Sequence, residues 1–249
     1  MAQPLTTLDG LLNKRVALEQ PSSGYRVAVD TVLLASAVPA LPGDKILDLG
    51  CGVGGAMLAL TCRVPDLTGV GVDIQAELVV LCRRNIGRNS FAAGLDVRFE
   101  DATQLPDDLQ NAFDHVLMNP PYHQDDRHDV SEDEMKRGAN SEKTGELPLW
   151  IASAALALRP SGTLTLIHRA DRTEEILSLL TPAFGDIWVL PVVPREGNDP
   201  KRVIIRARLD AVYAVRKGRS FVLHKESGAY SEEAEQVLRH CQALVFQSP

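Results

Sequence analysis

Between residues 45 and 209, short apolar runs alternate with stretches of helical spacing. The apolar runs, each predicted to be a strand, are 45–50, 67–74, 95–101, 113–118, 162–168, 186–193 and 202–209. Apolar residues recur at helical intervals at 54–63, 76–89 and 145–158. Apolar strands separated by helices are typical of a parallel sheet that is covered on both faces. The pattern therefore predicts an open α/β fold with a mainly parallel sheet.

The segments outside this core are shorter. Residues 14–20 and 24–29 are predicted to form a hairpin around the turn PSS, and a helix is predicted to begin with Asp30 as its N-cap. The 249 residues include 45% apolar and 24% charged residues, as in ordinary globular proteins. We expect one domain over 1–249, with the hairpin and helix at 1–44, the core at 45–210 and a C-terminal extension at 211–249.

Cysteine usage and hydropathy limit the possible environment. The four cysteines form no C-x-x-C pair and no metal-like cluster, so we expect reduced thiols, no metal and a cytoplasmic location. No apolar run reaches the roughly 18–20 residues that a membrane span needs, so we expect no membrane partner.

Charge is distributed unevenly along the chain. Residues 195–225 contain nine Lys/Arg and three Asp/Glu, a net charge of +6. Because the whole chain has a net charge of −7, the other residues together carry −13. Alternation in the strand 202–209 places Arg202, Arg206 and Arg208 on one face. We predict that these arginines contact the phosphates of a nucleic acid. The alternative is a solvated strand face that discourages edge pairing.

The stretch DLGCGVGG, residues 48–55, follows the first core strand and precedes a helix. Gly50, Gly52 and Gly54 allow positive φ angles and close approach of a ligand to the backbone. Two cofactors remain open, because Gly50, Gly52 and Gly55 also fit the dinucleotide pattern G-x-G-x-x-G. Asp48 favours the D-x-G-x-G-x-G loop that binds S-adenosylmethionine, and a tight turn without a ligand is the third possibility.

Two further strand ends carry candidate cofactor ligands. Asp73 ends the second core strand, where a carboxylate can accept hydrogen bonds from both hydroxyls of a ribose, and Ile74 would contact the adenine. The alternative is that Asp73 caps the helix that follows, and the two roles can coexist. At the end of the third strand, Asp101 with the neighbouring Ala102 is a weaker candidate for binding the adenine amine, and a loop aspartate without a role is the alternative.

Asn119-Pro120-Pro121-Tyr122 ends the fourth strand and favours one chemistry. Proline fixes its own φ and restricts the residue before it, so Asn119 and Pro120 present their oxygens rigidly. The Asn119 side-chain oxygen and the Pro120 carbonyl can accept the two N–H groups of a planar amine, and Tyr122 can stack on a flipped base. The motif therefore predicts catalytic roles for Asn119, Pro120 and Tyr122, with Asn119 also near the cofactor.

With these motifs the chain resembles the class I S-adenosylmethionine-dependent methyltransferases of the N-P-P-[YF] group. It is most similar to bacterial valine-tRNA adenine-N6 methyltransferases, which share a hairpin, the D-x-V-L-L-A stretch at 30–35 and a segment like LRPSGTLTLIHR at 158–169. The resemblance implies a Rossmann-like sheet of seven strands with helices on both faces, the seventh strand antiparallel. It also implies S-adenosyl-L-methionine as cofactor and tRNA as the favoured RNA substrate.

Several other functions share parts of this pattern. Protein glutamine methyltransferases also use N-P-P-Y but carry a longer helical N-terminal domain, whereas 44 residues precede the first core strand here. Guanine-N2 methyltransferases of ribosomal RNA favour N-P-P-F, and DNA adenine methyltransferases need more target-recognition sequence than the loop 123–144 offers. Two other classes remain, an inactive methyltransferase fold that only binds RNA and an NAD dehydrogenase.

Overall fold

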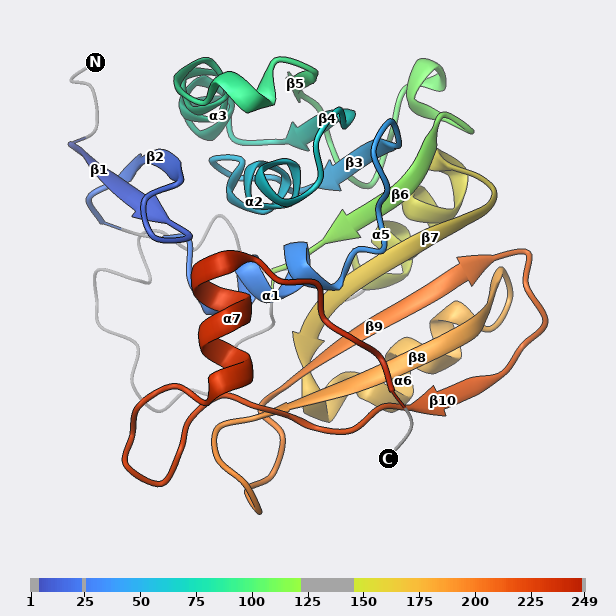
Figure 1. Ribbon diagram of the computed structural model, residues 1–249. Helices are drawn as coiled ribbons and strands as arrows, with labels where there is room; N and C mark the ends of the chain where they lie inside the picture. Colours follow the sequence, from blue (N-terminus) through green and yellow to red (C-terminus); the bar gives the residue numbers. More distant parts are fainter. Residues whose placement is uncertain (1–4, 24–25, 122–145, 248–249) are drawn as a thin grey trace, which may run out of the picture.

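The computed structural model describes residues 5–23, 26–121 and 146–247. Within these residues the core is a nine-stranded sheet in the order β10-β8-β9-β7-β6-β3-β4-β5, with β11 also paired to β8 (Figure 1). The strands are β3 Lys45–Leu49, β4 Thr68–Asp73, β5 Leu95–Phe99, β6 Phe113–Met118, β7 Leu158–Arg169, β8 Phe184–Val193, β9 Arg202–Leu209, β10 Val215–Lys217 and β11 Phe221–Val222.

Strand direction divides the sheet. From β5 through β4, β3 and β6 to β7 every pairing is parallel, whereas β9 runs antiparallel to both β7 and β8. The prediction of a mainly parallel α/β sheet with its seventh strand antiparallel is therefore confirmed. The structure adds β10 and β11, three and two residues long, which extend the sheet parallel to β8. Such short segments have too little alternation to be predicted as strands.

Helices cover both faces of the sheet and build two cores (Figure 1). The first core contains α1 Val29–Ala37, α2 Gly55–Arg63, α3 Ala76–Arg88 and α7 Glu232–His240. The second contains α5 Glu146–Ala157 and α6 Thr173–Leu180. Successive strand residues alternate between them, so that Ile46 packs in the first core and Leu47 in the second.

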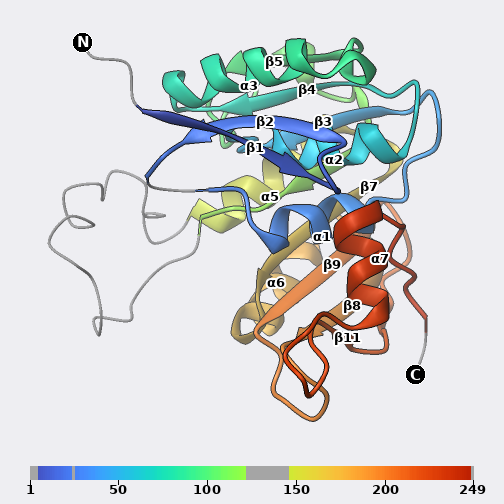
Figure 2. The ribbon, with the colours of Figure 1, turned by 60° about the vertical axis from the view of Figure 1, so that its left-hand side comes forward.

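The N-terminal hairpin lies beside α2 and α3, apart from the main sheet (Figure 2). It consists of β1 Thr6–Leu11 and β2 Val16–Pro21, so the predicted hairpin is present and its predicted strand 14–20 corresponds to β2. The partner strand is β1 and not 24–29, so the predicted turn at PSS is misplaced. The turn instead passes through Leu12, Asn13 and Lys14, which have φ angles of 52°, 55° and 66°. Asparagine tolerates this left-handed conformation better than most residues, but three successive positive φ angles without glycine give little sequence signal.

The start of α1 also differs from the prediction. The helix begins at Val29, with Ala28 at the N-cap and no side-chain cap hydrogen bond. Asp30 lies inside the first turn, where its carboxylate accepts a hydrogen bond of 2.8 Å from Arg202 Nε on β9. The aspartate thus joins α1 to the sheet instead of capping the helix.

Among the described residues, no helix combines the length and apolar character that crossing a membrane requires. The same residues contain no group of three or more side chains suited to holding a metal ion. All four cysteines are free thiols.

Candidate cofactor and active site

The candidate site lies where β3, β4, β5 and β6 end side by side. Parallel pairing aligns Leu49 with Val72 on β4 and with Met118 on β6, and Asp73 with Phe99 on β5. The residues that follow these strands therefore come together at one edge. This is the carboxyl edge of the sheet, where ligands of open α/β folds bind.

The glycine loop between β3 and α2 uses three positive φ angles, 66° at Gly50, 56° at Gly52 and 86° at Gly54. The glycines serve different purposes. A Cβ on Gly50 would lie 2.6 Å from the Trp150 ring, and one on Gly54 would lie 2.7 Å from Cys82 Sγ, so both are kept small by packing. A Cβ on Gly52 would meet nothing within 4 Å. The loop therefore has open space at Gly52, where a ligand can approach the backbone.

Asp73 is held beside this loop. Its Oδ2 accepts a hydrogen bond of 2.8 Å from the Gly52 N–H, and its Oδ1 accepts one of 2.9 Å from the Gln75 N–H. Burial raises the pKa of the Asp73 carboxyl, although both backbone N–H groups oppose that shift. Each oxygen keeps a second lone pair, so the carboxylate can still accept ribose hydroxyls.

Asp48 lies beneath the loop as a second buried acid, with 3% of its surface exposed. Its Oδ2 accepts a hydrogen bond of 3.3 Å from the Met57 N–H in α2. Burial, helped by the negative charge of Asp73, raises the pKa of Asp48 to about 8, although the Met57 N–H opposes the shift. A cationic ligand in the open space would favour the charged forms of both acids, as the positively charged sulfonium of S-adenosylmethionine would.

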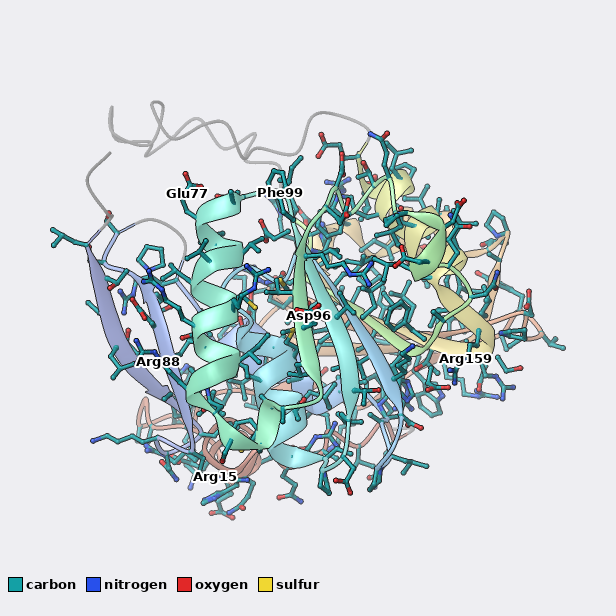
Figure 3. All side chains as sticks on the ribbon, turned by 90° about the horizontal axis from the view of Figure 1, so that it is seen from above. Arg15, Glu77, Arg88, Asp96, Phe99 and Arg159 are labelled. Carbon is teal, nitrogen blue, oxygen red and sulfur yellow. The ribbon has the colours of Figure 1, made fainter. Side chains whose placement is uncertain are left out.

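Two large apolar side chains are exposed at the same edge. Ile74, predicted to contact adenine, is 61% exposed, and Phe99 at the end of β5 is 59% exposed. Figure 3 shows Phe99 near Glu77, at the end of α3 that adjoins the site. The sequence reasoning missed Phe99, because it placed the end of this strand at the acidic residues that follow. An aromatic residue aligned with Asp73 was the available signal.

Asp101 and Ala102 occupy the loop after β5. Asp101 Oδ1 accepts hydrogen bonds from Thr103 N at 2.8 Å and Thr103 Oγ1 at 2.7 Å, and Gln104 Nε2 lies 3.4 Å from Oδ2. Asp101 thus stabilises its own turn, and only Oδ2 has room for a further strong donor. Ala102 is buried in the second core.

Asn119 follows β6 directly, one residue beyond the alignment of Met118 with Leu49. Because Gly50 is one residue beyond Leu49, the structure places Asn119 next to the glycine loop. Asn119 is partly exposed and Pro120 is buried. Tyr122, the predicted stacking residue, and the loop 123–144 lie outside the described residues.

The three predicted phosphate-binding arginines lie on one face of β9, but their surroundings differ. Arg202 pairs with Asp30 at the carboxyl edge. Arg206 lies under the C-terminal segment, 4.3 Å from the centroid of the Phe246 ring, and burial lowers the pKa of its guanidinium. Arg208 is exposed and aligns with Thr163, six residues along β7 from Arg169 at the carboxyl edge. The prediction that the three share one face is therefore confirmed, but they are spread along β9 and do not form one cluster at the carboxyl edge.

Other cations of the segment 195–225 are also paired within the chain. Arg216 contacts Asp186, Arg219 contacts Glu233 at 2.8 Å and Lys225 contacts Glu232 at 3.2 Å. The net +6 of this segment is thus partly neutralised by acids outside it.

Comparison with known proteins identifies the family. The family model for the methyltransferase small domain matches residues 22–191, more than half of the chain. A release factor glutamine methyltransferase of Agrobacterium fabrum is 37% identical over 118 residues, covering 46% of this chain and 39% of that protein. A tRNA1(Val) (adenine(37)-N6)-methyltransferase of Vibrio campbellii is 30% identical over 115 residues, covering 45% and 46%. The chain thus aligns with less than half the length of either relative.

A longer alignment reaches the rRNA N(6)-adenosine-methyltransferase metl-5 of Caenorhabditis elegans, at 23% identity over 70% of this chain and 74% of that protein. Among solved structures, a predicted O-methyltransferase of Agrobacterium tumefaciens has a TM-score of 0.73 at 24% identity and covers 88% of this chain and all of that one. At such identity the likeness concerns the fold.

The described residues fit the cofactor of this family. An open backbone at Gly52, a carboxylate at Asp73 and exposed apolar side chains at Ile74 and Phe99 match the phosphate-free, cationic nucleoside S-adenosylmethionine. The chain therefore belongs to the methyltransferase small domain family, and its cofactor is S-adenosyl-L-methionine.

Proposed function

We propose that the chain methylates an exocyclic amine of an RNA base, with adenine N6 in tRNA as the favoured target. One observation carries the proposal: Asn119-Pro120-Pro121 leaves β6 directly beside the glycine loop. An amine held by Asn119 and Pro120 would thus lie next to the cofactor.

The chemistry of the motif supports an amine substrate. S-adenosylmethionine supplies an electrophilic methyl group. The Asn119 side-chain oxygen and the Pro120 carbonyl would each accept one N–H of the amine, which frees the nitrogen lone pair for attack. Such alignment by fixed dipoles is a principal source of enzymatic rate enhancement. Stacking of the base on Tyr122 is part of the proposal.

The longest of these alignments favours an RNA substrate, whereas the highest sequence identity favours a protein substrate. The two adenine-N6 relatives from Vibrio and Caenorhabditis act on tRNA and rRNA by name, and the second aligns over 70% of this chain. The glutamine methyltransferase has the higher identity, over a match that is shorter than the Caenorhabditis one and about as long as the Vibrio one. Glutamine N5 of a protein is therefore the second candidate, because the side-chain amide also presents a planar NH₂ group.

Other candidates have less support. A guanine-N2 substrate requires the same clamp. An RNA-binding module without activity would have no need for the buried acid pair and the open glycine loop. A cytoplasmic location, expected from the free thiols, belongs to the same proposal.

The test is to incubate the chain with methyl-tritiated S-adenosylmethionine and separate fractions of cellular tRNA, rRNA, DNA and protein. We expect label in tRNA. Label in rRNA or DNA would redirect the substrate assignment, and label in protein would favour the glutamine alternative. Label in no fraction, with S-adenosylmethionine bound, would favour the inactive module.

A further inference from the structure

Two buried asparagines four residues apart lie toward the hairpin, Asn85 in α3 and Asn89 at the C-cap of that helix, with exposed fractions of 0% and 5%. The side-chain amide of each asparagine forms hydrogen bonds with both the N–H and the carbonyl of one residue of β2. Asn85 Oδ1 accepts from Glu19 N at 2.7 Å while its Nδ2 donates to Glu19 O at 2.8 Å. Asn89 does the same with Ala17, at 3.0 Å and 2.9 Å. The two side chains hold the hairpin against α3.

Asn85 makes one contact that Asn89 lacks. Its Nδ2 also donates to the carbonyl oxygen of Val53, at 3.0 Å. Val53 lies between Gly52 and Gly54 in the cofactor loop. The corresponding contact of Asn89 Nδ2 goes to the carbonyl of Asn85, at 2.7 Å, within α3 itself. Of these two asparagines, therefore, only Asn85 joins the hairpin to the cofactor loop.

The contact with Asn85 restrains the backbone of the glycine loop at Val53. The peptide group between Val53 and Gly54 is held at both ends, because its N–H donates to Cys51 O at 2.9 Å and its carbonyl accepts from Asn85. Glycines on either side of Val53 would otherwise allow this peptide to rotate. Its rotation would break the hydrogen bond from Gly54 N to Cys51 O, which closes the turn containing Gly52, where the ligand space opens and the N–H donates to Asp73.

We propose that Asn85 is a positioning residue for the cofactor, and that through it the docked hairpin holds the glycine loop in its binding conformation. By thermodynamic reciprocity, a cofactor that favours this loop conformation must also stabilise the hairpin on α3. Figures 2 and 3 show the hairpin beside α3, the arrangement that this coupling needs. The N-terminal hairpin is thus part of the cofactor site, although none of its residues lies in the glycine loop.

The matched variants are Asn85→Ala and Asn89→Ala, each of which leaves one N–H and one carbonyl of β2 unpaired. We expect both to lower the melting temperature, and only Asn85→Ala to weaken S-adenosylhomocysteine binding, by about tenfold as for one lost hydrogen bond. Isothermal titration calorimetry measures this. Equal affinity in the two variants, whether both unchanged or both weakened, would overturn the role of Asn85.

A measurement on the unchanged chain keeps the proposal testable if Asn85→Ala fails to fold. Hydrogen–deuterium exchange resolved to single amides compares the chain with and without saturating S-adenosylhomocysteine. We expect the ligand to slow exchange at the Glu19 amide, which donates to Asn85. Where the variants fold, Asn89→Ala should keep this slowing and Asn85→Ala should lose it. Unaltered exchange at Glu19 in the unchanged chain would refute the coupling.

Discussion

Polar residues are arranged differently in the two halves of the sheet. In the half formed by β3 to β6, parallel strands bring the glycine loop, Asp73, Phe99 and Asn119 to one edge. In the half formed by β7 to β9, the antiparallel β9 spreads its arginines from the carboxyl edge to the far edge. A polar pattern in a sequence therefore indicates a shared site when the strands that carry it end together.

Burial separates the halves as well. The acids of the first half are buried beside open space, where a ligand can use them. In the second half, Arg202 is paired with Asp30 and Arg206 is covered by Phe246, whereas Arg208 is exposed. We infer that the first half performs the chemistry and that most of the basic stripe formed by Arg202, Arg206 and Arg208 stabilises the fold.

The largest expected effect comes from Asn119→Ala. If the clamp acts mainly in the transition state, methyl transfer should fall by about 100-fold or more, while affinity for S-adenosylhomocysteine changes less than about threefold. Single-turnover rates and calorimetry measure the two quantities. A single-turnover rate equal to that of the unchanged chain would remove Asn119 from the mechanism.

Asp73→Ala should instead weaken cofactor binding more than it slows methyl transfer by the bound complex. The carboxylate offers charge-assisted hydrogen bonds to the ribose, so we expect S-adenosylmethionine to bind roughly 10–100-fold more weakly. Asp186→Ala is the control, since Asp186 pairs with Arg216 near the start of β8, away from the carboxyl edge. Comparable losses in both variants would show that the strand end at Asp73 has no special role.

The elevated pKa of Asp48, about 8, predicts a pH effect on stability. In the unfolded chain an aspartyl group ionises near pH 4, so between about pH 4 and 8 the folded state binds one more proton. The stabilisation is therefore complete below pH 4 and is lost as the pH rises toward 8. Asp48→Asn removes this dependence, so its melting temperature relative to the unchanged chain should increase from pH 5 to pH 8. A constant difference would mean that Asp48 is ionised in the fold.

The smallest effects are expected on β9. Arg206→Ala should lower the free energy of unfolding by roughly 1–2 kcal/mol through loss of packing and the contact with Phe246. It should leave the salt dependence of RNA binding unchanged. Arg208→Glu should leave stability unchanged and flatten the slope of log K against log[salt] by about 0.7–0.9, one phosphate contact. A flatter slope for Arg206→Ala would restore the whole stripe as an RNA contact.

The sequence was a reliable guide where periodicity and turn chemistry agree. The strands 113–118 and 202–209 match β6 and β9 residue for residue, and the helix 54–63 differs from α2 by one residue. Apolar strands next to glycine or proline leave little choice of boundary. The same agreement located the glycine loop, Asp73 and Asn119 at the ends of three strands.

Tertiary contacts decided what local pattern could not. Arg206 looks solvated in its strand, because the Phe246 that covers it is 40 residues away in the chain. The turn of the predicted hairpin was misplaced because the actual turn depends on positive φ angles without glycine. Asn85 looked like an ordinary helical residue, and its role appears only when β2 and the glycine loop meet on α3. Two asparagines on the apolar side of one helix were the available signal.

We propose that the carboxyl edge of β3 to β6 holds an adenine amine at Asn119 for methylation. The direct measurement supplies methyl-deuterated S-adenosylmethionine and unmodified tRNA to the unchanged chain and to Asn119→Ala, then identifies the nucleosides by mass spectrometry. We predict N6-methyladenosine carrying the deuterated methyl with the unchanged chain, and almost none with Asn119→Ala. Deuterated methyl on a guanosine or a ring nitrogen, or equal labelling by both proteins, would contradict the account.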